Sequence, residues 1–94
     1  MLEIRTEADG TIVLSGRFDA SQTDTAKKVF DKITKSCKVD FKDLNYISSA
    51  GLGELLGLQK RLMASGEKIK LVNVSGHIKD VFRYAGFQLI FDIE

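Results

Sequence analysis

The 94-residue sequence contains no proline, one cysteine and one histidine. Because Cys37 is alone, the chain can form neither a disulfide framework nor a cysteine metal cluster, and we expect a reducing, cytoplasmic setting. His77 would have to be the histidine of any Ser-His-Asp triad, and its spacing from the serines supports none. We expect His77 to be exposed near a helix start, Cys37 to act as a small buried hydrophobe and Tyr46 to pack beside a strand end.

Long apolar runs and an excess of either charge are also missing. No segment approaches the roughly 20 apolar residues of a membrane span, and the N-terminus is polar by residue 5, unlike a signal peptide. The formal net charge is +1, with acids and bases mixed along the chain, so nothing favours nucleic acid or a membrane as the main partner. At this length we expect one domain over residues 1–94.

Hydrophobic periodicity predicts an α/β fold. Residues 1–7 and 11–16 form a hairpin across the turn A-D-G, and 17–21 form a loop in which Asp19 or Ser21 caps the next helix. Helical spacing follows over 21–36, a short strand over 37–41 and a second helix over 49–64 that ends at Gly66. A strand over 68–74, a helix capped by Ser75 and a strand over 87–93 complete the order β-β-α-β-α-β-α-β. This alternation predicts a mixed sheet with amphipathic helices packed on it.

Catalytic motifs are absent. There is no G-x-S-x-G nucleophile elbow and no G-K-[S/T] after a glycine-rich loop. The G-x-G at 51–53 lies inside a predicted helix and lacks the third glycine of a dinucleotide fingerprint. No cluster of carboxylates or histidines indicates a metal site. We therefore expect a protein that is not an enzyme and holds no cofactor.

Two serines stand where an apolar strand gives way to the second helix, in Y-I-S-S-A-G-L-G. One of them is expected to cap the helix, which contributes about 1 kcal/mol, but a cap accounts for only one serine. It also leaves unexplained the helical glycines, each of which costs roughly 1 kcal/mol against alanine. At about 100° per residue, Ser49, Gly53 and Gly57 line one exposed strip. On the opposite, buried side the wheel places Leu52, Leu55, Leu56, Leu62 and Met63.

A bare strip beside a hydroxyl would let another protein's backbone approach closely, although tight packing would also explain the glycines. A serine there suits a switch, because phosphorylation adds about −1.5 to −2 charges. A helix N-terminus tolerates an anion, whereas a docked partner would have to desolvate it.

The stretch G-R-F-D-A-S together with 39–87 resembles the bacterial anti-sigma factor antagonists, the STAS domains. The pattern G-x-φ-D, φ-x-S-x-G-L, L-V-x-V-S and A-G-F carries the resemblance over nearly the whole chain. It implies a phosphorylation-switched module that binds an anti-sigma factor serine kinase when unphosphorylated and so frees a sigma factor for transcription. A metal-dependent serine phosphatase would reset it.

Residue by residue, the resemblance places phosphorylation on Ser49, with Ser48 as a rival, since many members carry Asp where Ser48 stands. It places Asp19 at the partner surface, which we expect to include Ser48, Ser49, Gly51, Gly53 and Gly57. The chain also stops where many members carry a further C-terminal helix.

Two other interpretations remain. STAS-like domains also serve as constitutive scaffolds in transporters and stress-signalling assemblies, where the serine would be a cap and the glycine strip a permanent docking surface. A small nucleotide- or anion-binding domain using the second helix N-terminus is a third hypothesis. The lack of a glycine-rich loop before that helix argues against it.

Overall fold

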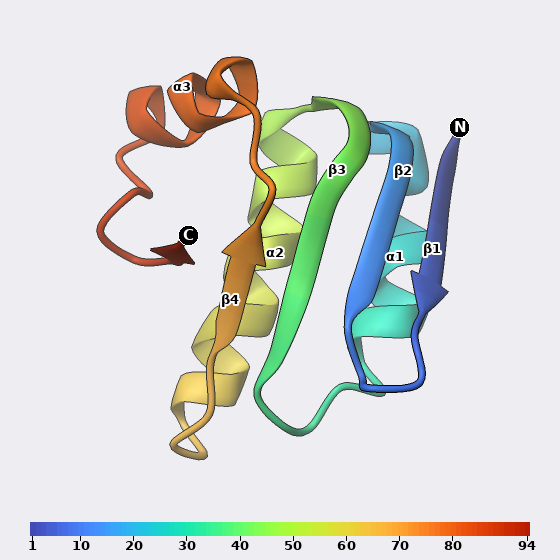
Figure 1. Cartoon of the computed structure of the whole chain (residues 1–94), viewed down its shortest axis with the longest axis vertical. Helices are drawn as coiled ribbons and strands as arrows, with labels where there is room; N and C mark the ends of the chain where they lie inside the picture. The colour runs from blue at the N-terminus through green and yellow to red at the C-terminus, as the bar shows by residue number, and fades with distance from the viewer.

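The computed structural model describes all residues 1–94 and shows a five-stranded mixed sheet with three α-helices (Figure 1). The strands are β1 (Leu2–Thr6), β2 (Ile12–Phe18), β3 (Cys37–Ile47), β4 (Ile69–Val72) and β5 (Asp92–Ile93). The helices are the 3-10 turn η1 (Ala20–Gln22) and the α-helices α1 (Thr23–Phe30), α2 (Ser49–Met63) and α3 (Gly76–Tyr84). The predicted α/β class and element order are confirmed.

The strands lie in the sheet in the order in which they occur in the chain, β1-β2-β3-β4-β5. β1 is antiparallel to β2, as a hairpin requires, and the remaining pairs are parallel. Parallel neighbours need crossovers, which α1, α2 and α3 provide. The C-terminal ends of β2 and β3 therefore meet at one end of the sheet, where η1 and α2 begin (Figure 1).

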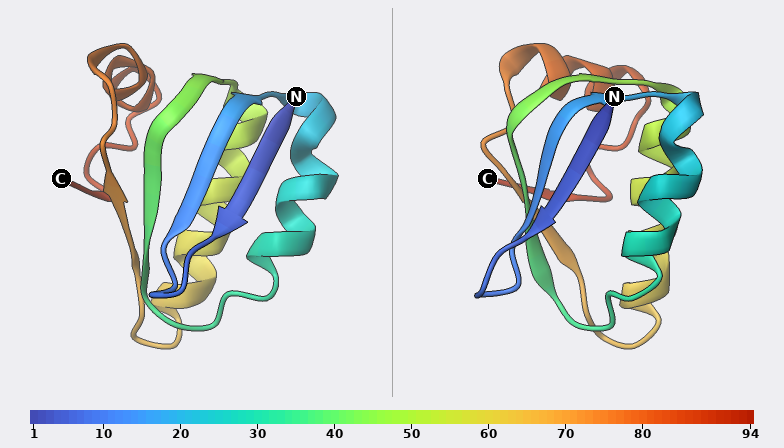
Figure 2. Two further views of the ribbon diagram at one scale, coloured as in Figure 1. Left: turned by 45° about the vertical axis from the view of Figure 1, so that its right-hand side comes forward. Right: turned by 90° about the vertical axis from the view of Figure 1, so that its right-hand side faces the viewer.

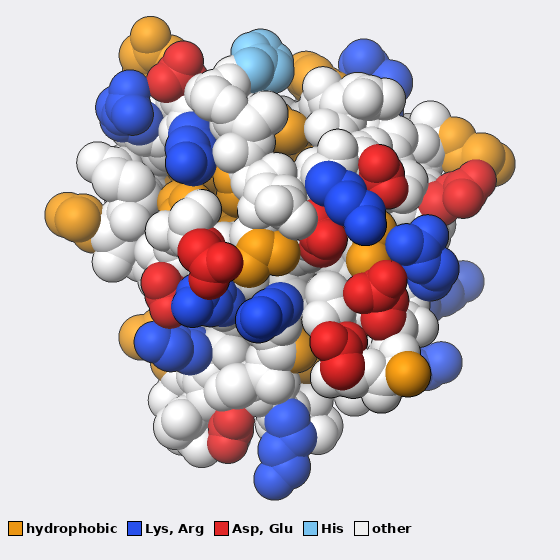
Figure 3. Space-filling view, viewed as in Figure 1, with side chains coloured by type: hydrophobic (Ala, Val, Ile, Leu, Met, Phe, Trp, Pro, Cys, Tyr) orange, Lys and Arg blue, Asp and Glu red, His pale blue; other side chains and the backbone are white.

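α1 and α2 form a layer that covers one face of the sheet, and α3 lies beyond the C-terminal end of β4 (Figure 2). The core fills the space between the two layers. Its largest fully buried side chains include Phe18, Phe41, Phe82, Leu14, Leu52, Leu55, Leu62, Ile69, Leu71 and Ile78. The other face of the sheet carries charged side chains of both signs (Figure 3). None of the helices combines the length and apolar character needed to cross a bilayer.

β3 runs six residues beyond its predicted end at 41, and β2 continues through Phe18, part of the predicted loop. The strand prediction relied on alternation, which breaks after Phe41 because the next buried residues, Leu44 and Ile47, follow at intervals of three. Register shifts in the β2–β3 pairing accommodate these intervals. Such bulges re-aim side chains, so a long strand here lacks a period of two.

Two other predicted elements are too long. α1 ends at Phe30 rather than near 36, and the Arg61 guanidinium donates to the carbonyls of Phe30 (2.6 Å) and Ile33 (2.9 Å). These bonds satisfy carbonyls that a continuing helix would have paired. The last strand holds only Asp92 and Ile93, and Leu89, which the pattern placed in it, is 90% exposed.

Gln59 is a buried polar residue that the sequence pattern did not reveal. Its side chain is 2% exposed, its Oε1 accepts the N–H of Ile69 (2.9 Å) and its Nε2 donates to the carbonyl of Ile90 (3.0 Å). The side chain thus joins α2 to the start of β4 and to the C-terminal segment. Conversely, the prediction that Met63 is buried is wrong, since it is 56% exposed, and Leu58 is buried instead.

We expect Gln59→Leu to lower the free energy of unfolding by about 1–3 kcal/mol, because it leaves the buried Ile69 N–H without a partner. Urea denaturation of this variant, compared with Gln88→Leu at an exposed position of the C-terminal segment, measures the effect. Equal stabilities of the two variants would show that the Gln59 bonds contribute nothing.

Candidate functional site

The serine pair lies where β3 ends and α2 begins, and the structure gives its members different environments. Ser48 is half-buried and is the N-cap of α2, with its Oγ accepting the N–H of Gly51 (3.2 Å). Ser49 is the first helical residue, is exposed, and its hydroxyl forms no hydrogen bond within the protein. One serine is therefore a cap, and the other presents a free hydroxyl at a helix N-terminus.

The end of β2 brings Asp19 to the same place. The N–H of Ser48 donates to the carbonyl of Phe18 (2.9 Å), which fixes the residue after Phe18 beside the start of α2. Asp19 caps η1, because its Oδ1 accepts hydrogen bonds from the N–H (3.0 Å) and the hydroxyl (2.6 Å) of Ser21. In turn, the side-chain Oε1 of Gln22 accepts the N–H of Asp19 (3.2 Å). Of the two predicted caps, Asp19 rather than Ser21 fills the role, and it caps the short turn η1, whereas α1 itself has no side-chain cap.

Asp19 is also held in its charged form. The hydroxyl and backbone N–H of Ser21, and then the charge of Arg17, lower the pKa of the Asp19 carboxyl. The Arg17 Nε is 4.0 Å from the carboxylate, and its guanidinium stacks over the Tyr46 ring at 4.3 Å from the centroid. A fixed negative charge and a stacked cation thus flank the serine pair. The Arg17–Tyr46 pair escaped sequence reasoning because it depends on the register of β2 and β3.

The three glycines of α2 divide into two kinds. Gly51 is buried, and a Cβ there would meet the Phe18 carbonyl oxygen at 2.8 Å and Ile47 Cγ1 at 2.9 Å. The expectation that Gly51 forms part of a partner surface therefore needs correcting, since it seats α2 against the ends of β2 and β3. Gly53 and Gly57 are exposed, and a Cβ added at either position would meet nothing within 4 Å. These two glycines therefore form a bare strip with Ser49.

The remaining candidates occupy ordinary places. His77 is exposed in the first turn of α3, as expected, and Ser75 caps that helix through the N–H of Ile78 (3.3 Å). Cys37, predicted as a small buried hydrophobe, packs against the core but is only half-buried, and this burial raises the pKa of its thiol. None of these residues lies at the N-terminus of α2, where the serine pair is.

With this geometry established, comparison with known proteins gives the family. The family model described as "Mlab, STAS domain" matches residues 2–91. The chain belongs to the STAS domain family. BtrV of Bordetella bronchiseptica, whose name places it among the anti-sigma factor antagonists, is 32% identical over 82 residues, which are 87% of this chain and 70% of BtrV.

Three solved structures show the same fold. The unphosphorylated anti-sigma factor antagonist SpoIIAA aligns with a TM-score of 0.72 and 19% identity over all of this chain and 87% of its own. The phosphorylated form of SpoIIAA from Bacillus aligns with a TM-score of 0.70. A sulfate transporter family protein from Wolinella succinogenes aligns with a TM-score of 0.70 and 22% identity, over 82% of this chain and 66% of its own. The STAS fold thus occurs both in an anti-sigma factor antagonist and in a transporter family protein, the two kinds of protein that the sequence suggested.

Alanine at Gly51 and Gly53 should shift stability in opposite directions. Gly51→Ala should lower the free energy of unfolding by about 1–3 kcal/mol, because its methyl group overlaps the Phe18 carbonyl. Gly53→Ala should raise it by up to about 1 kcal/mol, because alanine favours the helix and the methyl meets nothing. Chemical denaturation of both variants tests this, and destabilisation by Gly53→Ala would mean that the strip packs against something.

Alanine substitutions at the two serines should also differ in their effect on the free energy of unfolding. Ser48→Ala should cost about 1 kcal/mol through the loss of the cap, whereas Ser49→Ala should leave the free energy of unfolding within about 0.5 kcal/mol of wild type. Thermal and urea unfolding of the pair measures the difference. If Ser49→Ala proves the more destabilising, the cap has been assigned to the wrong serine.

Proposed function

We propose that the protein is an anti-sigma factor antagonist whose binding is switched by phosphorylation of Ser49. In this proposal the unphosphorylated chain binds an anti-sigma factor that is also a serine kinase, and thereby frees a sigma factor for transcription. A metal-dependent serine phosphatase restores the binding form. The module itself acts by binding, without catalysis or cofactor, in the bacterial cytoplasm.

The observation that carries the proposal is the division of labour between the serines. Because Ser48 already caps α2, a kinase can modify the exposed Ser49 hydroxyl without removing a bond that holds the fold. A phosphate on the first helical residue lies at the positive end of the helix dipole, which favours an anion. The modified domain should therefore remain folded.

The surface around Ser49 suits a partner that must leave after modification. Gly53 continues the exposed surface one turn further along α2 without a side chain, so a partner's backbone can lie close to it. A partner that packs over Ser49 must desolvate a doubly charged phosphate, at a large cost unless the phosphate is paired. Asp19, which is held in its charged form, follows the residue whose carbonyl accepts the Ser48 N–H, so it adds a negative charge at the same end of the sheet. Binding, rather than folding, is then what phosphorylation controls.

The relatives support this choice over a constitutive scaffold. BtrV carries the antagonist name at 32% identity, and SpoIIAA has been solved in phosphorylated and unphosphorylated forms with this fold. The Wolinella succinogenes neighbour keeps the scaffold function in view. The scaffold proposal differs in one respect, because its partner would bind regardless of Ser49.

Ser49→Asp should weaken binding to the kinase partner by at least about tenfold, roughly 1.4 kcal/mol, while the melting temperature stays near that of wild type. Ser49→Ala and Ser48→Ala are the matched controls, and both should bind. The partner is first captured from native cells on immobilised Ser49→Ala protein and identified by mass spectrometry, and affinities are then measured by calorimetry.

Intact mass and fragmentation of the native protein complete the test. One phosphate on Ser49 supports the proposal, and a phosphate on Ser48 moves the switch to the other serine. Absence of phosphate under all growth conditions, together with equal binding by Ser49→Asp and wild type, would refute the switch and favour the scaffold. A Gly53→Gln variant should lose the partner in either case, since it fills the strip without altering Ser49.

A further inference from the structure

A lysine-lined hollow lies at the end of the sheet opposite Ser48 and Ser49. Its volume is about 330 Å³, at the lower end of the range for small-molecule pockets. Its lining includes the first residues of β3 and a residue of β4, whereas the serine pair follows the end of β3. The start and the end of β3 lie at opposite ends of the sheet (Figure 1). Its lining residues are Asp9, Thr11, Ser36, Cys37, Lys38, Lys68 and Lys70.

Two of these lysines lie opposite each other on neighbouring strands of the sheet. Lys38 on β3 and Lys70 on β4 are register partners, and their chain neighbours Val39 and Leu71 point into the core. Both lysines therefore project from the uncovered face of the sheet, since successive side chains alternate between faces. Like charges directly opposite each other across two strands are unfavourable, and nothing in the packing of the core requires lysine at either position.

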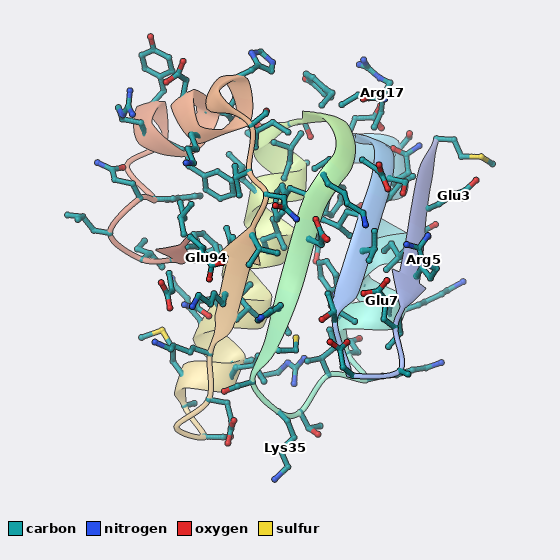
Figure 4. The ribbon with its side chains drawn as sticks, in the orientation of Figure 1. Glu3, Arg5, Glu7, Arg17, Lys35 and Glu94 are labelled. Carbon is teal, nitrogen blue, oxygen red and sulfur yellow. The ribbon has the colours of Figure 1, made fainter.

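The carboxylates near the hollow compensate these charges only in part. Glu94 lies beside β4 (Figure 4) and contacts Lys70 at 2.9 Å, and Asp92 contacts Lys68 at 3.4 Å. Each of these pairs is exposed, so each contributes little to stability. Lys38 forms no ion pair. The Asp9 carboxylate also lines the hollow, and the hydrogen bond that its Oδ1 accepts from the Thr11 N–H (3.0 Å) lowers its pKa, so it remains a negative charge near Lys38.

We propose that this hollow binds the phosphate group of a small phosphate-bearing molecule. Lys38 and Lys70 supply charged donors from neighbouring strands. The Ser36 hydroxyl is not available as a ligand, because it donates to Glu67 (2.7 Å) and accepts the N–H of Lys68 (2.9 Å). A phosphate dianion between the lysines replaces their repulsion by attraction to a common charge. The dianion competes with Glu94 for Lys70. This site is independent of phosphorylation at Ser49, and it lies at no helix N-terminus.

Because Glu94 competes with phosphate for Lys70, the proposal predicts opposite effects of two substitutions on phosphate binding. Lys38→Gln should weaken phosphate binding by about tenfold, because it removes the unpaired cation. Glu94→Gln should strengthen binding about two- to threefold, because it releases Lys70. Lys79→Gln, an exposed lysine of α3 outside the hollow, is the matched control and should bind as wild type does.

The probes are inorganic phosphate and glycerol phosphate, titrated against chloride at constant ionic strength. A ligand of the folded state raises the melting temperature, and amide NMR shifts should concentrate in residues 36–39 and 68–70. Vesicles containing phosphatidic acid form a second arm, which distinguishes a soluble ligand from a lipid headgroup.

The expected result is saturable stabilisation by the soluble probes with the two opposite variant effects. Equal responses of Lys38→Gln and Lys79→Gln would overturn the proposal, because they would show general screening of charge. Shifts confined to the first turn of α2 would overturn it by placing the anion at the serine site. Binding to vesicles without any response to soluble phosphate would replace the small-molecule pocket with a membrane contact.

Discussion

The contact between Gly51 and the end of β2 is the constraint on which the candidate site depends. Without a side chain, Gly51 lets the first turn of α2 press against the Phe18 carbonyl and Ile47, while the Ser48 N–H bonds to that same carbonyl. This close contact fixes the direction of α2 and makes Ser48, rather than Ser49, the N-cap of the helix. It also brings the end of β2, and with it Asp19, to the end of the sheet where α2 begins. The assignment of the cap to Ser48 and the exposure of the Ser49 hydroxyl both follow from this close approach of backbone to backbone.

Much of the fold could be predicted because local signals agreed with it. The hairpin turn and the Ser75 cap depend on neighbouring residues and were confirmed. The buried face predicted for α2 was only partly right, because Met63 is exposed and Leu58 is buried. The errors arose where distant residues decide. β3 keeps Leu44 and Ile47 inside through register shifts that β2 imposes. α1 ends where Arg61, which belongs to the next helix, donates to the carbonyl of its last residue, Phe30, and to that of Ile33 in the segment that follows. The local sequence around β3 or α1 includes neither β2 nor Arg61, so it could not predict where these two elements end.

The candidate site shows the same division. Helical spacing correctly placed Ser49, Gly53 and Gly57 on an exposed strip, because an α-helix has a fixed period. It could not distinguish Gly51, whose role depends on what faces it across the β3–α2 junction, nor could it reveal the stacking of Arg17 on Tyr46. Gln59 was equally hidden, because a glutamine in a helix reads as solvated until its two partners, in β4 and the C-terminal segment, are known.

The identity between strand order in the sheet and strand order in the chain has a consequence for biogenesis. Each strand pairs with the one synthesised just before it, so no strand must be inserted between two that are already joined. The β1–β2 hairpin can form first, and β3 and β4 can be added to a growing edge as they leave the ribosome. Only the β1–β2 pairing is local, because each parallel pairing closes a crossover that contains a helix, and such non-local pairing slows folding. The small β5 is added last, so a nascent chain lacking it already contains every residue of the serine site.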